Sequence, residues 1–303
     1  MAGKRRGRKV RRVCGAEVRQ TVALAVATDA AAYARLRRCG LFEGVEFGAY
    51  LRCTEGRLRA LRGTGVDVHL RVLEPVDFED FCAEHLLDPA DPVAEVAYAA
   101  DPELAGEPFA YEGEGLAELL PVLTEDHRAR VRISIGCAAL LAAVGWESSP
   151  QERVAAVLGY VSEVVMALAE GAGDGPHRVT VRSLGLLDGE ELTAVAGLPV
   201  QDGKPAGLGR EVEAFCVTLA AAVAGCGSGE LMLYRADGAV HGWVLVDGWL
   251  RPMTAAETAA VLELGAGGAG VVGPELPVPE RGVTGCPGFP LPVPGGGGAV
   301  AGS

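Results

Sequence analysis

The hydrophobic pattern of the first part of the chain predicts two strands joined by helices. Residues 18–28, VRQTVALAVAT, become continuously apolar toward their end, which indicates a strand whose burial increases along its length. Helical patterns follow at about 30–39 and 46–62, the second with apolar residues at steps of three, four and seven. Residues 66–73, VDVHLRVL, predict a second strand, and Asp77 opens another short helix. This order is that of a βαβ crossover, so we expect the two strands to be parallel.

The rest of the chain reads as helices and a hairpin. Residues 116–144 are helical in pattern, and Ser148-Ser149-Pro150 indicates a boundary because Ser149, Pro150 and Glu152 form a good helix start. Asp237-Gly238 lies between two apolar runs and predicts a β-hairpin turn. The aromatic side chains around this hairpin, Trp243 among them, favour core packing over a binding face.

Four segments follow from these patterns, in a chain of α/β or α+β class. We expect a disordered basic arm at 1–12, a partial Rossmann-like βαβ layer at 13–148, a smaller domain of helices and a β-hairpin at 149–265, and a flexible Gly/Pro-rich tail at 266–303.

Composition and hydropathy add three points to this interpretation. The chain has no Asn, and 24 Arg stand against 3 Lys, a bias typical of GC-rich coding, so Asp, Ser, Thr and Gly must supply the caps and tight turns. The 8 cysteines include no CxxC pair, which favours reduced thiols in a cytoplasmic protein. No apolar stretch has the roughly 18 residues needed to span a bilayer, and the basic N-terminus lacks the apolar region of a signal peptide, so no membrane association is expected.

Charge is segregated along the chain. The net charge is −13, yet the first 73 residues sum to +10 and the remainder to −23. The arm holds seven positive charges, and these are Lys4, Arg5, Arg6, Arg8, Lys9, Arg11 and Arg12. Such a cluster would neutralise phosphates, so nucleic acid or another polyanion is one hypothesis for a partner. No aromatic residue is interleaved to stack on bases, and the alternative interpretation is a solubilising tail or a product of coding bias.

Most catalytic signatures are missing from the sequence. There is no Walker-type phosphate loop, no H-E-x-x-H, no Cys/His zinc spacing and no G-x-S-x-G elbow. The run at residues 265–270 fits G-x-G-x-x-G, but a helix precedes it where a dinucleotide site needs a strand, so it indicates a helix end and a linker.

Three carboxylates are the candidate catalytic residues. If the two predicted strands are parallel neighbours, Asp29, Glu74 and Asp77 lie at the same carboxyl edge, where ligands of open α/β sheets bind. Together they could hold Mg²⁺ for phosphoester chemistry. The competing interpretation is that Asp29 and Asp77 cap the helices that follow them, while Glu74-Pro75 ends a strand.

These observations leave open whether the chain is an enzyme and favour the view that it is not. The leading hypothesis is a non-catalytic cytoplasmic interaction or regulatory protein, without a cofactor, that binds an unknown protein partner and contacts a polyanion through its arm. The alternative is a Mg²⁺-dependent phosphoester hydrolase or nuclease that uses Asp29 with Glu74 or Asp77.

Overall fold

The computed structural model of the chain describes residues 20–102, 104, 108–145, 149–187, 190–207, 209–267 and 283–294. These residues form a mixed α/β protein, as predicted, in two compact units at 1–121 and 122–303. The division falls inside a helix and not at the predicted Ser148-Ser149-Pro150 boundary. Pro150 does begin a helix, but that helix belongs to the second unit together with the residues before it.

The first unit is built on a small sheet whose central pair is parallel. Its elements in chain order are β1 (Thr21–Val26), α1 (Ala30–Arg38), α2 (Phe47–Gly63), β2 (Asp67–Val72), α3 (Pro75–Glu84), α4 (Pro92–Ala100) and β3 (Phe109–Ala110). β1 and β2 pair in parallel from Thr21 opposite Asp67 to Val26 opposite Val72, which confirms the predicted crossover. β3 adds an antiparallel strand on the other side of β2.

Aromatic rings fill much of the core of the first unit. Tyr33 of α1 lies with its ring centre 4.9 Å from that of Tyr50 on α2, and Phe42 stacks on Tyr33 at 5.2 Å. The Tyr50 hydroxyl accepts a 3.0 Å hydrogen bond from the backbone N–H of Ala27, just beyond β1. Burial raises the pKa of Tyr50 to about 12, so this hydroxyl stays neutral at ordinary pH.

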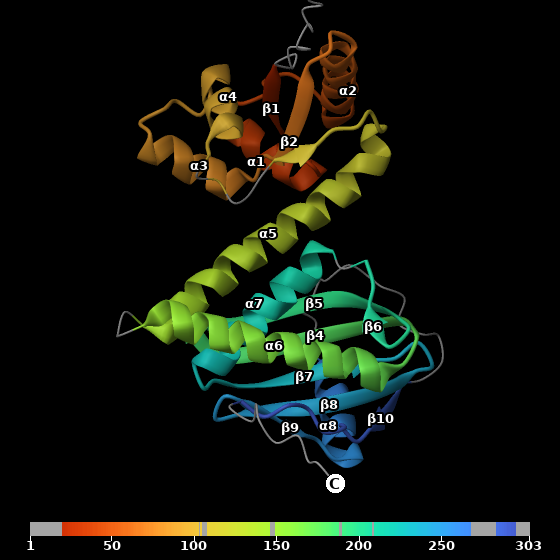
Figure 1. The fold of residues 1–303 in the computed structure, drawn as a ribbon. Coiled ribbons are helices and arrows are strands. Elements are labelled where there is room, and N and C mark those ends of the chain that lie inside the picture. The colour runs from red at the N-terminus through yellow and green to blue at the C-terminus, as the bar shows by residue number, and fades with distance from the viewer. Residues whose placement is uncertain are drawn as a thin grey trace, which may run out of the picture. The chain divides into compact units, whose positions relative to one another are not determined.

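The second unit holds the larger sheet and its helices. Its elements are α5 (Leu116–Val144), which begins in the first unit, then α6 (Pro150–Ala172), β4 (Gly175–Leu187), β5 (Glu190–Gln201), β6 (Lys204–Pro205), α7 (Arg210–Ala224), β7 (Ser228–Tyr234), β8 (Ala239–Val246), β9 (Trp249–Pro252), α8 (Ala255–Gly267) and β10 (Thr284–Cys286). The strand order is β10-β8-β7-β4-β5-β6, with β9 paired to β8 (Figure 1). The predicted hairpin is confirmed, since β7 and β8 pair antiparallel across a turn at Asp237-Gly238.

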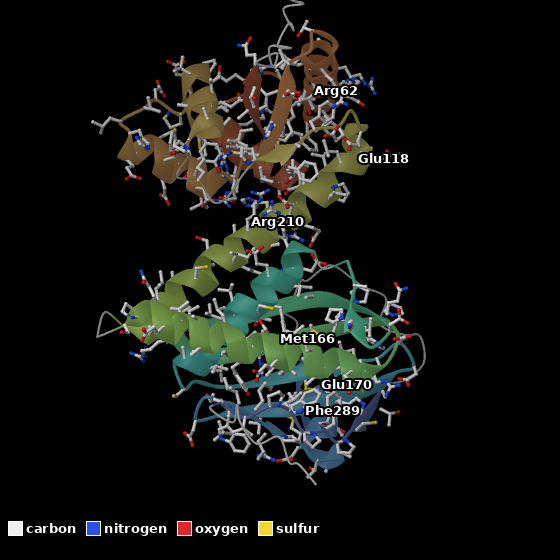
Figure 2. All side chains as sticks on the ribbon, in the orientation of Figure 1. Arg62, Glu118, Met166, Glu170, Arg210 and Phe289 are labelled. Atoms are coloured by element: carbon white, nitrogen blue, oxygen red, sulfur yellow. The ribbon has the colours of Figure 1, made fainter. Side chains whose placement is uncertain are left out.

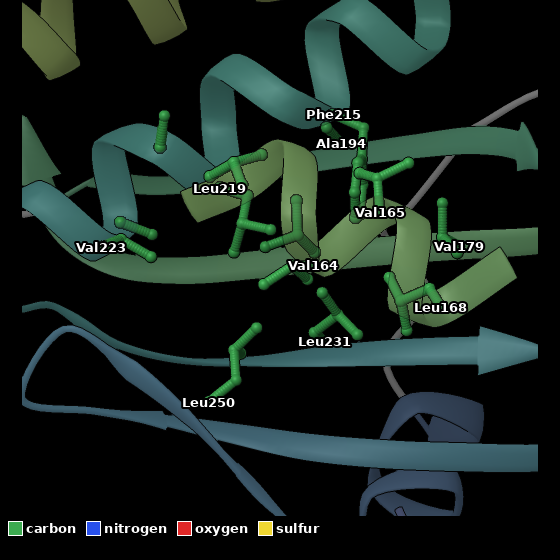
Figure 3. Close-up of a cluster of buried hydrophobic side chains, with 14 of the residues drawn as sticks. Val164, Val165, Leu168, Val179, Ala194, Phe215, Leu219, Val223, Leu231 and Leu250 are labelled. Atoms are coloured by element: carbon green, nitrogen blue, oxygen red, sulfur yellow. The ribbon is translucent and has the colours of Figure 1, made fainter. Parts of the chain in front are cut away.

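Helices α6 and α7 cover one face of this sheet, and the main core lies between them and the strands (Figure 1). Alternate residues of the strands point inward, as the two-residue period of a half-covered sheet requires. Figure 3 shows side chains that meet there from both helices and four strands: Val164, Val165, Leu168, Val179, Ala194, Phe215, Leu219, Val223, Leu231 and Leu250.

The long helix α6 meets the length and composition of a membrane span, the one described helix to do so. Its two faces differ, however. One side, which includes Val161, Val164 and Leu168, is buried in the core, and the other carries exposed residues such as Glu163 and Glu170. This is the pattern of an amphipathic helix that packs one face against a protein core.

The predicted flexible tail at 266–303 is wrong for one stretch. Residues 283–294, here called the docked segment, lie against the second unit, where Thr284–Cys286 form β10 beside β8. Leu291 is 8% exposed and belongs to the main core. Gly and Pro content indicated a segment without a core of its own, and the docked segment instead uses the core of the sheet that precedes it.

Candidate functional site

Asp29 caps the helix that follows it. The backbone at Asp29 is extended, and its Oδ1 accepts hydrogen bonds of 2.8 Å from the N–H groups of both Ala31 and Ala32. These are two of the donors that the first turn of a helix leaves without an intrahelical partner. The capping interpretation of Asp29 is confirmed.

Glu74 takes the capping position that the sequence assigned to Asp77. Its Oε2 accepts from the N–H groups of Val76 at 2.7 Å and Asp77 at 3.0 Å. Helix α3 begins at Pro75, because proline has the backbone angle of a first helical residue and lacks the N–H that would be unsatisfied there. Asp77 therefore lies within the first turn, where its charge complements the helix dipole.

The carboxyl edge of the parallel pair thus holds two helix caps. Asp29 follows β1 and Glu74 follows β2, and each carboxylate is engaged by the helix that it begins. Within the described ranges, no group of three or more His, Cys, Asp or Glu side chains is placed to hold a metal ion. Asp29, Glu74 and Asp77 therefore gain no geometry that favours Mg²⁺ binding.

The basic residues of α2 mostly have structural partners. Arg59 pairs with Glu55 one turn earlier at 2.7 Å, as an exposed helix face would. Arg62 donates to the carbonyl oxygen of Tyr111 at 2.6 Å, which ties α2 to the segment after β3. The arm residues from Lys4 to Arg12 lie outside the described residues.

Residues 72–127 form a long acidic stretch that follows the basic half of the first unit. They contain 16 Asp and Glu and no Lys or Arg. Six of these acids, Asp77, Glu79, Asp80, Glu84, Asp88 and Asp91, are exposed on α3 and the loop before α4. The first unit therefore joins a basic N-terminal half to an acidic C-terminal half.

Helix α4 is apolar on both of its sides. Ala94, Tyr98 and Ala99 are buried against the first unit. The opposite side, here called the α4 surface, is formed by the exposed residues Val93, Val96 and Ala100. Val93 is 62% exposed and Val96 56%.

Few charges accompany this helix. Its one charged residue, Glu95, is half-buried, and burial raises the pKa of its carboxyl group against the opposing effect of Arg57. Asp91 caps the first turn by accepting from the N–H of Val93 at 2.9 Å, and Asp101 follows the last turn. The α4 surface is thus an uncharged strip between Asp91, whose carboxylate caps the first turn, and Asp101, whose partly buried carboxylate lies 3.9 Å from His85 Nε2.

In the second unit, the docked segment lies between β8 and helix α8, at a place here called the groove. Thr284, Gly285 and Cys286 pair in parallel with residues 239–241 of β8. The N–H of Thr284 donates to the carbonyl oxygen of Gly238 at 3.0 Å, and the N–H of Gly288 donates to that of Met253 at 2.9 Å. The segment is therefore held by backbone hydrogen bonds at both ends of a short extended run.

Phe289 anchors the docked segment in the core. Its ring meets the fully buried Trp243 edge-on, with centres 4.9 Å apart and planes at 78°. The indole N–H of Trp243 donates to the carbonyl oxygen of Phe289 at 2.7 Å. The ring lies against Gly171 of α6, where a Cβ would collide with it. Figure 2 labels Phe289 and Glu170, the residue before Gly171.

Two glycines let the segment approach the sheet and helix α8. A Cβ on Gly285 would lie 2.9 Å from the backbone nitrogen of Ala259, and a Cβ on Gly288 would collide with the carbonyl oxygen of Gly242. The fully buried Thr258 places its hydroxyl 3.0 Å from the carbonyl oxygen of Cys286. Side chains larger than hydrogen at these two positions would force the segment away from the groove.

A capping box fixes the start of α8, which forms one wall of the groove. Thr254 and Glu257 bond reciprocally, with the N–H of Thr254 donating to Glu257 Oε2 at 2.7 Å and the N–H of Glu257 donating to Thr254 Oγ1 at 3.2 Å. Hydrogen bonds from Arg251 and Thr254 lower the pKa of Glu257 to about 2. The carboxylate therefore stays ionised, and the box intact, well below neutral pH.

The first unit is similar in sequence to one known family. A family model described as a domain of unknown function, DUF8829, matches residues 7–114. No curated protein and no solved structure matches the chain. The similarity concerns the unit that holds Asp29, Glu74 and the α4 surface, and the family's description names no activity.

Sequence reasoning missed both the groove and the α4 surface. The sequence patterns predicted no element between the short helix opened by Asp77 and residue 116, yet Asp91-Pro92 begins α4 with a cap and an N1 proline. The same signal marked Ser149-Pro150, so the start of α4 could have been found. The docked segment offered only isolated apolar residues, Phe289 and Leu291 among them, in a Gly/Pro background.

Proposed function

We propose that the chain is a non-catalytic interaction protein whose first unit binds a basic, apolar-faced helix of a partner protein on the α4 surface. The observation that carries this proposal is the exposure of Val93 and Val96 on a helix whose other side is already buried. A helix that is apolar all round is usually covered on both sides. Burying a valine side chain contributes about 1.5–3 kcal/mol, so covering these two would favour association.

The charges around α4 define the chemistry of that partner. Asp88 and Asp91 precede the helix and Asp101 follows it, and residues 72–127 hold no Lys or Arg. A partner helix with an apolar face bordered by Lys or Arg would complement both features. A second copy of the same surface would place carboxylates against carboxylates, which disfavours self-association here.

The test compares the unaltered chain with a double variant, Val93→Ser with Val96→Ser. The probe is a synthetic amphipathic helix with leucines on one face and lysines along its borders. Binding of the probe should weaken at least tenfold, because about 1.4 kcal/mol of apolar contact is tenfold in affinity. Both valines are exposed, so the free energy of unfolding should change by less than about 0.5 kcal/mol. Titration calorimetry and denaturant unfolding measure the two quantities.

The matched control is Val45→Ser, which alters another exposed valine of the first unit, in the loop before α2. This variant should bind the probe as the unaltered chain does. Equal binding by all three proteins would contradict the proposal. A chain without residues 1–12 tests a different occupant, since a tenfold gain in probe affinity on deletion would assign the α4 surface to the chain's own basic arm.

A second proposal concerns the arm, as a site for nucleic acid or another polyanion. Its support is the seven positive charges without an acid at residues 1–12. If these contact phosphates, the affinity of the full chain for duplex DNA or RNA should fall by about 10³-fold between roughly 50 and 200 mM salt. A variant with the seven residues changed to Gln should lose the binding and its salt dependence. Equal binding by both proteins would remove this proposal.

The phosphoester hydrolase alternative has less support. A metal site at the carboxyl edge would have to compete with the helix N–H groups that Asp29 and Glu74 already accept from. Location in the cytoplasm also remains a proposal. It is supported by the seven cysteines of the described residues, all of which have free thiols, as expected in a reducing compartment.

A further inference from the structure

We propose that the second unit carries a peptide-binding groove, filled in this chain by its own docked segment, that accepts an extended, uncharged segment of a partner protein with the pattern Gly-x-Pro-Gly-Phe-x-Leu. This inference concerns a different unit from the α4 surface and does not depend on it. Its basis is a set of contacts that recognise the backbone, one ring and two glycines of residues 283–294.

Strand addition to β8 supplies the first part of the recognition. On the side of β8 away from β7, β9 pairs with residues Trp243 to Val246 and stops at Pro252. The neighbouring residues 239–241 are left for another strand, and β10 pairs with them in parallel. An open run of backbone donors and acceptors on an edge strand is the common means by which a sheet binds an extended peptide.

The Phe289 site supplies the anchor. Trp243 is fully buried, and its indole N–H has the Phe289 carbonyl oxygen as its acceptor. Removing that acceptor without a replacement would leave a buried donor without a partner, which is unfavourable. The ring lies directly over Gly171, where a Cβ would collide with it. An empty groove would therefore favour any segment that brings an aromatic side chain and a carbonyl oxygen to these positions.

The two glycines restrict the sequence that fits. Gly285 faces the backbone of α8 and Gly288 faces the backbone of β8, and a Cβ at either position meets backbone atoms, which cannot move aside as a side-chain end can. Residues 283–294, VTGCPGFPLPVP, carry no charge, and Leu291 enters the core two residues after the ring. The groove thus selects the spacing between the glycines, the ring and the leucine of a bound segment, as well as its uncharged composition.

The connection to α8 explains how such a groove would be regulated. Fifteen residues, 268–282, separate the end of α8 from the docked segment. Because the segment belongs to the same chain, its binding is intramolecular and is favoured over that of a free peptide. A partner must then bind well enough to compete with it, so the intact chain should bind free peptide more weakly than a chain whose segment can leave.

The test uses the full chain with a specific protease site substituted within residues 268–282, and a fluorescent peptide of residues 283–294 as the probe. After cleavage and removal of the released fragment, the protein should bind the probe, and the uncleaved chain should bind it at least tenfold more weakly. A probe with Phe289→Ala should also bind at least tenfold more weakly to the cleaved protein. Fluorescence anisotropy measures all three affinities.

Two substitutions on one helix provide a matched pair. Gly171→Ala places a Cβ where the ring lies, whereas Gly159→Ala, also on α6, places one in open space. Probe affinity should fall at least tenfold in the cleaved Gly171→Ala protein and stay unchanged in the cleaved Gly159→Ala protein. Equal affinity for both variants would overturn the assigned ring site.

Hydrogen exchange in the uncleaved chain tests the proposal even if cleavage unfolds the second unit. If the segment leaves the groove by itself, the N–H groups of Thr284 and Gly288 should exchange at least tenfold faster than those of β4 and β7. Exchange at the rate of the whole sheet, or a cleaved fragment that never dissociates, would overturn the proposal and make residues 283–294 a permanent strand. Swapping of the segment between two copies would support it, because the groove would then accept its segment in trans.

Discussion

Replacing Trp243 by alanine should lower the free energy of unfolding of the second unit by about 3–5 kcal/mol. Trp243 is the largest fully buried side chain among the described residues, and it lies where the core meets the groove. The substitution removes the indole, its edge-on contact with Phe289 and the donor to the Phe289 carbonyl oxygen together. Hydrogen exchange of peptides from β4 and β7, followed by mass spectrometry, measures the loss in the unit concerned.

Two further variants divide this effect into its parts. Trp243→Phe keeps most of the buried apolar volume but lacks the N–H, so it should free the docked segment while costing the sheet less than the alanine substitution does. Trp249→Ala removes the same side chain from β9, where Trp249 is only half-buried, and should destabilise the unit less. Equal losses for Trp243→Ala and Trp249→Ala would contradict the central position assigned to Trp243.

The parallel pair and the cap at Asp29 could be predicted from the sequence because their signals are local. The apolar run before Asp29 marks β1, and the order of strand, helices and strand leaves few topologies open. The absence of Asn leaves Asp among the few residues that can cap, and Asp29 does so. The error at Asp77 has an equally local origin, since the proline of Glu74-Pro75 was taken as the end of a strand although it also suits the first turn of a helix.

The parts that escaped prediction depend on contacts between distant residues. The interval that forms β5, EELTAVAGLPVQ, mixes two acids, a glycine and a proline, and only its pairing with β4 over eleven positions makes it a strand. The docked segment reaches Gly238, Met253 and Trp243 across a long stretch of chain. The unit boundary could not be read either, because it falls within the continuous helix α5 and not at a linker.

Site prediction followed the same division between local and distant signals. The carboxylates at 29, 74 and 77 were found because strand ends are marked in the sequence. A capping role was weighed for Asp29 and Asp77 from the residues beside them, whereas Glu74 was interpreted as a strand end. The α4 surface and the groove have no sequence motif. They are defined by which side of a helix the rest of the unit has already buried, and by a ring that meets a glycine more than a hundred residues before it.

Phe78 should matter to the first unit as Trp243 does to the second. Replacing Phe78 by alanine should lower the free energy of unfolding of the first unit by about 3–5 kcal/mol. Phe78 of α3 is fully buried, and its ring meets that of Tyr98 on α4 edge-on, with centres 5.5 Å apart and planes at 84°. Because Tyr98 lies on the buried side of α4, this contact positions the helix that presents Val93 and Val96. Exchange should therefore accelerate in β1, β2 and α4 but not in β4 or β7, if the two compact units unfold separately.

The control for Phe78 is Val76→Ala on the same helix, where the side chain is 43% exposed and the cost should be below about 0.5 kcal/mol. Binding of the amphipathic probe gives a second measurement. In Phe78→Ala it should weaken with the fraction of the first unit that is unfolded, whereas Val93→Ser with Val96→Ser should weaken it in a fully folded unit. If Phe78→Ala accelerates exchange in both units alike, the two do not unfold separately, and α4 cannot be treated as the docking element of an independent domain.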